Sequence, residues 1–187
     1  MSITLIFGSM YSGKTTELIR RVTRYQSIGK RVLVVNNALD DRYAGDNSII
    51  THDEYSYNCV KCKSLSEIDD IMRLEADVDV VAIDEGQFFP DLKKYVVKFC
   101  EKYAKHVVVA GLTGDFQRNK FGCMIDLLNY ANNIVHLKAF CTICSDGTLA
   151  IFTKKICTGV DQIEVGSTKK YVALCRRCYL NKGSDID

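Results

Sequence analysis

Residues 8–16 read Gly8-Ser9-Met10-Tyr11-Ser12-Gly13-Lys14-Thr15-Thr16, a full match to the pattern G-x-x-x-x-G-K-[ST]. The apolar run Ile3-Thr4-Leu5-Ile6-Phe7 comes directly before this segment, and apolar residues at helical spacing (Leu18, Ile19, Val22, Tyr25) follow it. In that setting a glycine-rich turn points backbone N–H groups at the phosphates of a nucleotide, and the helix N-terminus adds positive potential. Lys14 would reach the β- and γ-phosphates, and the Thr15 hydroxyl would bind Mg²⁺. A chance match in a Gly/Ser-rich turn is the alternative, but the flanking strand and helix favour binding of a nucleoside triphosphate.

The composition predicts one well-packed domain with at most a small appendage. The chain has 187 residues and a formal net charge of +2. Because it carries no segment strongly enriched in Lys and Arg, we expect no nucleic-acid partner. The basic residues of the first expected helix and the turn after it are more typical of a solvated helix face or a subunit contact: Arg20, Arg21, Arg24, Lys30 and Arg31.

The sequence contains no stretch with the length and apolar character of a membrane span. Met1 leads straight into the first expected strand without a basic-then-apolar leader. We therefore expect a cytoplasmic protein with no membrane partner, kept in a reducing compartment. Nine cysteines in that setting indicate metal ligands or free thiols rather than a disulfide framework.

The first 140 residues alternate short β-branched runs with longer amphipathic segments. The expected strands are Thr4–Phe7, Val32–Asn36, Val78–Ile83, His106–Ala110 and Ile134–Ala139. The expected helices are Thr15–Ile28, Ser66–Glu75, Asp91–Tyr103 and Phe121–Asn132. Because the strands are almost entirely apolar, we expect an α/β fold whose parallel sheet is covered by helices on both faces. This is the architecture of P-loop NTPases, in which ligands bind beyond the carboxyl ends of the strands.

The character of the sequence changes after Phe140. Residues 1–140 would form the nucleotide-binding α/β domain, and residues 141–179 a small lobe that carries five of the nine cysteines. Residues 180–187 are polar and are expected to form a flexible tail.

Two acids end the apolar run before residue 86. Asp84 is placed like the acid that holds Mg²⁺ in nucleotide-binding proteins, directly or through water. Glu85 could face the space beyond the γ-phosphate and accept a proton from an attacking hydroxyl or water. The alternative is that both acids stabilise the N-terminus of a following helix. The phosphate-loop motif upstream favours the catalytic interpretation.

Aromatic and basic residues follow three of the expected strands. Phe88 and Phe89 could pack in the core or form the wall of a pocket for a flat ring. Phe116 and Phe121 flank Gln117 and Arg118, and stacking on a base is plausible there. Arg42 could steady a phosphoryl group in transit, or it could belong to a solvated acid–base turn.

The small lobe contains two C-x-x-C pairs, Cys141–Cys144 and Cys175–Cys178. Four thiolates from two such turns match a tetrahedral Zn²⁺ site without an open position, which is a structural site. A redox pair would be expected to open a helix beside a strand, and neither pair clearly does so. A third pair, Cys59 and Cys62, could join either of the others or consist of ordinary thiols at a strand end. Three further cysteines are expected to be buried thiols: Cys100, Cys123 and Cys157.

Several motifs in one order resemble the type II thymidine kinases, the family of cytosolic, poxviral and many bacterial thymidine kinases. They are Gly8–Thr16 followed by Glu17-Leu18-Ile19-Arg20-Arg21-Val22, Asp40-x-Arg42-Tyr43, Thr51-His52-Asp53, Ile83–Asp91, and Phe116-Gln117-Arg118 with Phe121-Gly122. The resemblance extends from Ser2 to about Tyr179. It implies that a homotetramer uses ATP and Mg²⁺ to phosphorylate the 5′-hydroxyl of thymidine or deoxyuridine, which yields dTMP for DNA synthesis.

The same resemblance assigns roles to individual residues. Glu85 would be the general base, Arg42 would contact the phosphoryl group, and Thr15 and Asp84 would serve Mg²⁺. ATP would contact Gly8, Ser9, Met10, Tyr11, Ser12, Gly13, Lys14, Thr15, Thr16, Asp84 and Gln87. The nucleoside would contact Met10, Phe88, Leu112, Phe116 (stacked on the ring), Phe121, Glu164, Val165, Gly166, Ser167 and Tyr171. Structural zinc would be held by Cys141, Cys144, Cys175 and Cys178, with no metal at Cys59 and Cys62.

The sequence departs from the family pattern at a few positions. The animal and poxviral branch usually has Leu-Asp-Gly-Thr-Phe where this chain has Leu112-Thr113-Gly114-Asp115-Phe116. Lys120 stands where a proline is usual, and Ser167 stands where the substrate-covering loop usually has a second glycine. If that position needs a positive φ, Ser167 strains the turn.

Two other functions compete with a nucleoside kinase. A P-loop hydrolase would use Glu85 to activate water and would need no nucleoside pocket. A zinc-ribbon nucleic-acid binder regulated by ATP would need a basic stripe through residues 141–178, which the sequence lacks.

Overall fold

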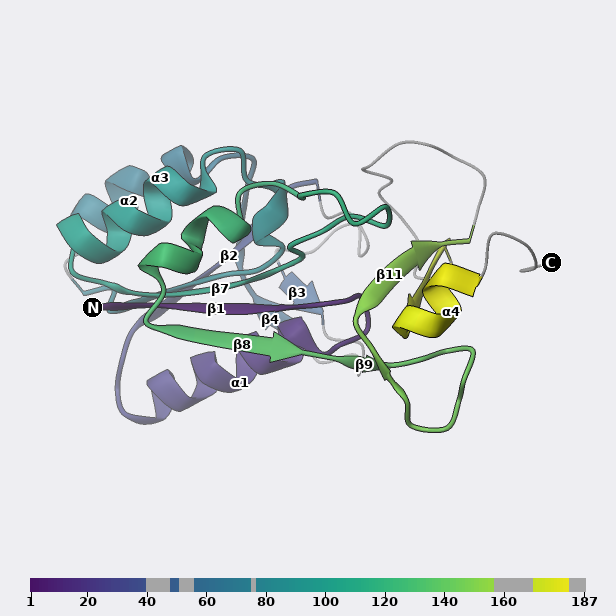
Figure 1. Cartoon of the computed structure of the whole chain (residues 1–187). Coiled ribbons are helices and arrows are strands. Elements are labelled where there is room, and N and C mark those ends of the chain that lie inside the picture. Colours follow the sequence, from purple (N-terminus) through teal and green to yellow (C-terminus); the bar gives the residue numbers. More distant parts are fainter. Residues whose placement is uncertain (40–47, 51–55, 75–76, 157–169, 182–187) are drawn as a thin grey trace.

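A six-stranded sheet with the order β5-β2-β6-β7-β1-β8 forms the centre of the molecule. Our computed structural model of the chain describes residues 1–39, 48–50, 56–74, 77–156 and 170–181 (Figure 1). The strands are β1 (Ser2–Gly8), β2 (Val32–Asn37), β5 (Val60–Cys62), β6 (Val80–Ile83), β7 (His106–Gly111) and β8 (Asn133–Leu137). Neighbouring strands of this sheet pair in parallel, so the prediction of a parallel α/β sheet is confirmed.

Helices cover both faces of the sheet and create two separate cores (Figure 1). Helix α1 (Lys14–Ser27) packs Leu18 and Val22 against one face. The opposite face carries η1 (Leu65–Ile68), α2 (Asp69–Leu74), α3 (Leu92–Val97), the π-helical turn η3 (Lys98–Lys102) and the 3₁₀ helix η4 (Ile125–Tyr130). Both faces of the central strands are therefore covered by helices, and both are apolar, as the composition of these strands predicts.

Strand β8 differs from its prediction because it is the last strand of the sheet. Among the described strands it has a neighbour on one side only, and 51% of Ile134 is exposed. The prediction that this strand is buried on both faces is therefore wrong. After Leu137 the chain leaves the sheet, and Ala139 belongs to a separate strand, β9 (Ala139–Phe140).

The helix expected at Phe121–Asn132 is also shorter than predicted. Gly122 has φ 57°, a left-handed conformation that an α-helix cannot contain, and the 3₁₀ helix begins only at Ile125. A Cβ at Gly122 would lie 2.2 Å from the Gln87 carbonyl oxygen. Glycine is required at this position for both its φ angle and its close approach to the backbone.

Short strands that local periodicity does not predict complete the main domain. Strands β3 (Ser48–Ile50) and β4 (Ser56–Asn58) form an antiparallel pair, and β5 adds to the edge of β2. Ile49 is buried and joins the core on the α1 side.

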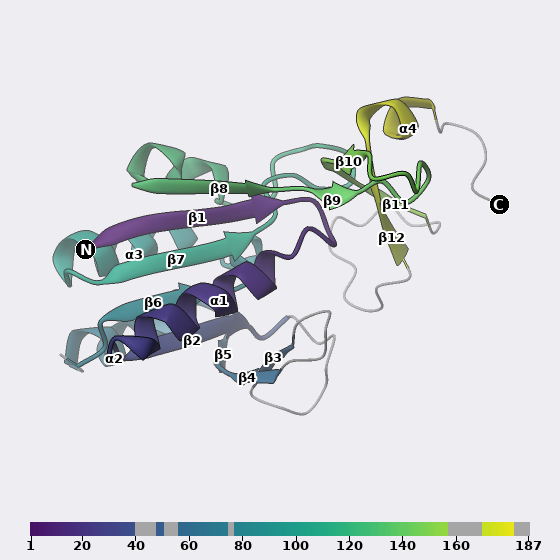
Figure 2. The same ribbon diagram turned by 90° about the horizontal axis from the view of Figure 1, so that it is seen from below.

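The chain beyond β8 forms a small lobe beside the carboxyl end of the sheet (Figure 2). Strand β9 pairs with β10 (Leu149–Ala150), and β11 (Phe152–Lys155) pairs with β12 (Tyr171–Leu174), both antiparallel. Helix α4 (Arg176–Asn181) follows, and a third cluster of buried residues fills the lobe. Leu180 and Asn181 thus belong to a helix rather than to the expected tail. The domain division near residue 140 stays a prediction, although this third cluster supports it.

Among the described residues we find no helix with both the length and the apolar character needed to traverse a bilayer.

Candidate active site

The phosphate-loop motif connects β1 to α1, as the sequence predicts. Gly13 caps the helix with φ 80° and ψ 26°, and its carbonyl accepts a hydrogen bond from the Glu17 N–H at 2.9 Å. The Lys14 ammonium donates to the Ser9 carbonyl at 2.9 Å and so lies against the loop. A Cβ at Gly8 would lie 2.3 Å from the Leu137 carbonyl oxygen, because the loop crosses close to the end of β8. The result is a tight backbone turn at a helix N-terminus, the geometry that binds phosphate.

Thr15 and Asp84 meet at the centre of the site. The Thr15 hydroxyl donates a 2.9 Å hydrogen bond to Asp84 Oδ2. Asp84 follows β6 and is only 3% exposed. A hydroxyl and a carboxylate oxygen at this separation are hard oxygen donors of the kind that Mg²⁺ accepts.

Glu85 lies next to this pair, and Gln87 holds its carboxylate. Glu85 has the left-handed angles φ 50° and ψ 43° and is 8% exposed. The Gln87 side-chain amide donates to Glu85 Oε2, and its carbonyl oxygen accepts the Leu112 N–H at 2.8 Å. Gln87 thereby connects the acid after β6 to the backbone after β7. A non-glycine residue held at positive φ stores strain, which is common at functional sites.

Two residues of the expected aromatic wall are in contact with each other. Phe88 and Phe121 pack edge to face with ring centroids 5.6 Å apart. Phe89 is fully buried and belongs to the core, whereas Phe88 is only partly buried.

Residues Thr113–Phe121 form a tight hairpin whose turn depends on Asp115. Gly114 and Lys120 pair across it, and the Phe121 N–H donates to the Thr113 carbonyl at 3.1 Å. Asp115 Oδ1 accepts the N–H groups of Gln117 at 2.9 Å and Asn119 at 2.8 Å. Asp115 is 8% exposed. A Thr hydroxyl can make the same kind of local bond more weakly, which accounts physically for Asp at this position.

The second departure in this hairpin also has a partner. The Lys120 ammonium pairs with both carboxylate oxygens of Asp126, at 2.8 Å and 2.6 Å. This ion pair is largely exposed to solvent and connects the hairpin to η4.

Hydrogen bonds from three consecutive residues join the phosphate loop to the described part of the small lobe. Ser9 Oγ donates to the Ala150 carbonyl at 3.2 Å, and the Met10 N–H donates to Thr153 Oγ1 at 3.0 Å. The Tyr11 hydroxyl donates to the Tyr171 carbonyl at 3.1 Å. Met10 and Tyr171, two of the expected pocket residues, thus both lie at this junction.

A cavity of about 230 Å³ lies between the start of the phosphate loop, the Leu112–Asp115 segment and the beginning of β11. Leu112 is the expected pocket residue that lines it; Thr153, also in its wall, was not predicted.

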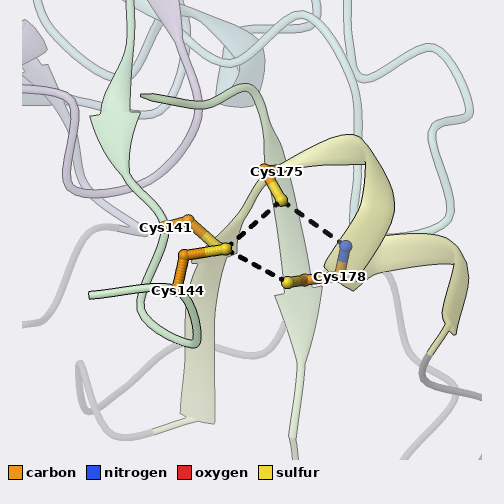
Figure 3. A group of neighbouring side chains, drawn as sticks. All are labelled: Cys141, Cys144, Cys175 and Cys178. Atoms are coloured by element: carbon orange, nitrogen blue, oxygen red, sulfur yellow. Dashed lines mark hydrogen bonds between the residues drawn. The ribbon is translucent and has the colours of Figure 1, made fainter. Parts of the chain in front are cut away.

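The four cysteines of the small lobe converge (Figure 3). Their sulfur atoms all lie within 4.8 Å of one another, with Cys144 Sγ 3.8 Å from Cys175 Sγ and 3.5 Å from Cys178 Sγ. Tetrahedral zinc with Zn–S bonds of about 2.3 Å requires sulfur separations of roughly 3.8 Å. The donor set therefore fits a closed zinc site.

The environment of Cys141 favours the ligating form of its thiol. Burial raises the pKa of this thiol, but hydrogen bonds from the backbone N–H groups of Cys175, Cys144 and Ile143 outweigh burial and lower the pKa below its usual value. The pKa of the neighbouring Cys178 thiol is raised instead, first of all by its hydrogen bond with Cys144. The thiolate is the form that binds metal.

The third cysteine pair belongs to no metal-ligand cluster among the residues that the structure describes. Cys59 packs in the core on the α1 face of the sheet, and Cys62 in the core on the opposite face. Burial raises the pKa of Cys62 to about 11, so this thiol stays protonated. Both are ordinary buried thiols, which was one of the alternatives that the sequence left open.

Some expected site residues lie outside the described residues: Arg42, Glu164, Val165, Gly166 and Ser167. Sequence reasoning missed Thr153 and the bonding role of Asp115. Thr153 does not belong to any sequence motif that would have pointed to it. The role of Asp115 could have been noticed, because Asp side chains commonly accept a hydrogen bond from the backbone N–H two residues further along a turn.

Comparisons with known proteins agree with the geometry. The family model described as "Thymidine kinase" matches residues 1–179. "Thymidine kinase 1" of Dictyostelium discoideum is 41% identical over 184 residues, covering 95% of this chain and 77% of that protein. "Thymidine kinase, cytosolic" of Homo sapiens is 40% identical, covering 97% of this chain and 74% of the relative. "Thymidine kinase" of Myxoma virus (strain Uriarra) is 39% identical, with 95% of both chains covered.

Proposed function

Because this chain belongs to the thymidine kinase family and phosphorylates thymidine with ATP, we propose that the residues around Thr15 and Asp84 carry out the transfer to the 5′-hydroxyl. The observation that supports this most directly is the contact of these two side chains at 2.9 Å. It joins the phosphate loop to the strand end that bears Glu85. Deoxyuridine, which lacks only the 5-methyl group, is the second expected substrate.

The phosphate loop would hold the triphosphate of ATP. In the proposed arrangement backbone N–H groups of residues Gly8–Thr16 surround the phosphates, and Lys14 leaves the Ser9 carbonyl to reach the β- and γ-phosphates. Thr15 and Asp84 would hold Mg²⁺, which neutralises charge on the phosphates when bound. Transfer through a loose transition state depends mainly on such positioning and charge stabilisation.

Glu85 would act as the general base. Its carboxylate would accept the proton of the nucleoside 5′-hydroxyl as that oxygen attacks the γ-phosphorus. Gln87 supports this role by holding one carboxylate oxygen while it is itself anchored on the Leu112 N–H. The contacts of Gln87 favour a positioning role over the direct ATP contact expected from the sequence. Arg42 stays a proposal for contact with the transferred group.

The thymine ring would lie among apolar side chains at the junction of the main domain and the small lobe. The proposed wall consists of Met10, Phe88, Leu112, Phe116, Phe121 and Tyr171, with Glu164–Ser167 closing it. The edge-to-face pair of Phe88 and Phe121 and the Met10–Thr153 hydrogen bond support this arrangement.

Zinc would tie together the strands that carry part of this wall. Cys141 and Cys144 follow β9, and Cys175 and Cys178 follow β12. Such a site has no open position and takes no part in the chemistry. Its proposed role is to hold the lobe against the phosphate loop.

We further infer a cytosolic location, a homotetrameric assembly and a role in nucleotide salvage for DNA synthesis. The names of the human and chicken relatives include the word cytosolic, which supports the first point.

The test is transfer of the γ-phosphate of ATP, with Mg²⁺, to thymidine, deoxyuridine, deoxycytidine and deoxyguanosine, beside a control without nucleoside. We expect 5′-monophosphates of thymidine and deoxyuridine alone. Phosphate release without a nucleoside product would instead favour a hydrolase, and would contradict the assignment of Glu85 to the 5′-hydroxyl.

A further inference from the structure

Tyr179 connects the cysteine cluster to the hairpin that carries Phe116. It follows Cys178 directly in helix α4, and its N–H donates to the Cys175 carbonyl at 2.9 Å. Its hydroxyl donates a 2.8 Å hydrogen bond to the backbone carbonyl of Phe116, 63 residues away in the sequence. Tyr179 thus joins two of the cysteine residues, through its backbone, to the tip of the hairpin, through its side chain.

The bond from Tyr179 reaches the hairpin from the small lobe, in addition to hydrogen bonds within the hairpin, which include backbone bonds of Asp115 with Arg118 and Asn119. Asp115 binds the N–H groups of Gln117 and Asn119, and the base of the hairpin is closed by the Phe121–Thr113 bond. These contacts shape the turn itself. The direction of the turn relative to the small lobe depends on contacts made from outside, and the hydroxyl of Tyr179 supplies a directional one.

The ring of Tyr179 adds a second contact with the same hairpin. The Arg118 guanidinium lies 4.9 Å from its centroid, and the Phe152 ring lies 4.9 Å away on the lobe side. A guanidinium over an aromatic ring is stabilising by about 0.5–1 kcal/mol at exposed sites. Arg118, whose guanidinium stacks on the Tyr179 ring, has φ 70°, a left-handed conformation that is uncommon for residues other than glycine.

Phe116 is held from the lobe side in a second way. The Lys155 ammonium of β11 lies 5.3 Å from the Phe116 ring centroid, and Lys155 is only 9% exposed. Both the carbonyl and the ring of Phe116 therefore contact the small lobe. Movement of α4 would be transmitted to this residue.

We propose that Tyr179 is a positioning residue for recognition of the nucleoside base: it fixes Phe116 relative to the phosphate loop, and the zinc site fixes Tyr179. The inference rests on the proposed function, in which Phe116 stacks on the thymine ring. Tyr179 itself makes no contact with substrate in this proposal. Removing its hydroxyl should loosen the base-binding side of the site and leave the phosphate side unchanged.

The experiment measures thymidine binding to the zinc-loaded protein by calorimetry, together with the KM for thymidine and for ATP. Tyr179→Phe keeps the ring and loses the hydroxyl, and we expect thymidine affinity to fall about two- to tenfold, the size expected for one neutral hydrogen bond. The KM for ATP and the zinc content should not change. The matched control is Tyr103→Phe, which removes a comparable 3.1 Å phenol bond to Asp69 far from the site. It should leave thymidine affinity unchanged.

A double-mutant cycle identifies the residue through which Tyr179 acts. Phe116→Ala alone should weaken thymidine binding, and adding Tyr179→Phe to it should weaken binding no further. Full additivity of the two changes would overturn the inference. So would wild-type thymidine affinity in Tyr179→Phe when Phe116→Ala binds weakly. If Phe116→Ala has no effect, or the wild-type protein does not phosphorylate thymidine, the proposed site or function is what fails.

Discussion

The phenol of Tyr11 donates a 3.1 Å hydrogen bond to the backbone carbonyl of Tyr171, and so joins the phosphate loop to the first residue of β12. Tyr11 has φ 63°. A non-glycine residue in this region carries strain of about 1–3 kcal/mol that surrounding contacts must offset. The bond offsets part of this strain and ties the proposed ATP site to a proposed wall of the base pocket.

Tyr11→Phe should therefore reduce the coupling between the two substrates. We expect a non-hydrolysable ATP analogue to tighten thymidine binding to the wild type, and this tightening to be smaller in the variant by a factor of about 2–10, the value of one hydrogen bond. Because linkage is reciprocal, the effect of thymidine on binding of the analogue should fall by the same factor. Calorimetric titrations with and without the second ligand measure both quantities.

The control for this change is Tyr130→Phe, at a tyrosine that is 40% exposed on η4. It should leave both affinities unchanged. Equal coupling between the two ligands in Tyr11→Phe and in the wild type would show that the Tyr11–Tyr171 bond does not contribute to this coupling.

Glu85→Gln should separate binding from catalysis. The amide keeps the size of the side chain but cannot accept the proton of the 5′-hydroxyl. We expect kcat to fall by about 10²–10⁴-fold, the usual contribution of a general base, with ATP binding retained. Glu101→Gln, at an exposed position of η3, is the control and should keep wild-type turnover. A Glu85→Gln variant with wild-type kcat would remove Glu85 from its proposed role.

The main domain was predictable because its signals are local. The phosphate-loop motif, the apolar runs of β1, β2, β6 and β7, and the helix after Gly13 each depend on residues close together in the sequence. A parallel sheet buried on both faces leaves a continuous apolar signature that needs no knowledge of the partner strand. The convergence of Cys141, Cys144, Cys175 and Cys178 was predictable for a similar reason, since the spacing within each pair carries the signal.

The contacts that join the phosphate loop to the small lobe could not be predicted from local sequence signals. Thr153 binds the Met10 N–H from 143 residues away, and Tyr179 binds the Phe116 carbonyl from 63 residues away. Neither residue belongs to a motif, and their roles exist only because the small lobe packs beside the phosphate loop. The exposed edge of β8 escaped prediction for the same reason, since its apolar residues resemble those of a central strand.

Asp115 gives a prediction about the hairpin that departs from the family pattern. Asp115→Ala removes the acceptor of two backbone N–H groups and should lower the free energy of unfolding by about 1–3 kcal/mol. The KM for thymidine should rise while the KM for ATP stays the same, because the hairpin carries Phe116 and not the phosphate loop. Thermal unfolding and steady-state kinetics measure the two effects.

Asp115→Asn tests whether the acceptor oxygen or the charge matters at this position. The amide oxygen can accept the same two N–H groups, so this variant should stay close to the wild type in melting temperature and thymidine KM. A loss as large as that of the alanine variant would mean that the negative charge is required, and that the turn bonds do not explain the residue.

Cys175→Ser tests the link between the metal and the base pocket. Replacing one of four thiolates should reduce zinc bound at neutral pH, lower the melting temperature and weaken thymidine binding. The cause is that α4 and β12 lose their common anchor, and with it the support of Tyr179 and Tyr171. Metal analysis, thermal unfolding and thymidine titration give independent readings. Cys123→Ser, at a cysteine outside the cluster, should keep the zinc. If Cys175→Ser lost its zinc and still bound thymidine with wild-type affinity, the lobe would be held against the phosphate loop by its hydrogen bonds alone.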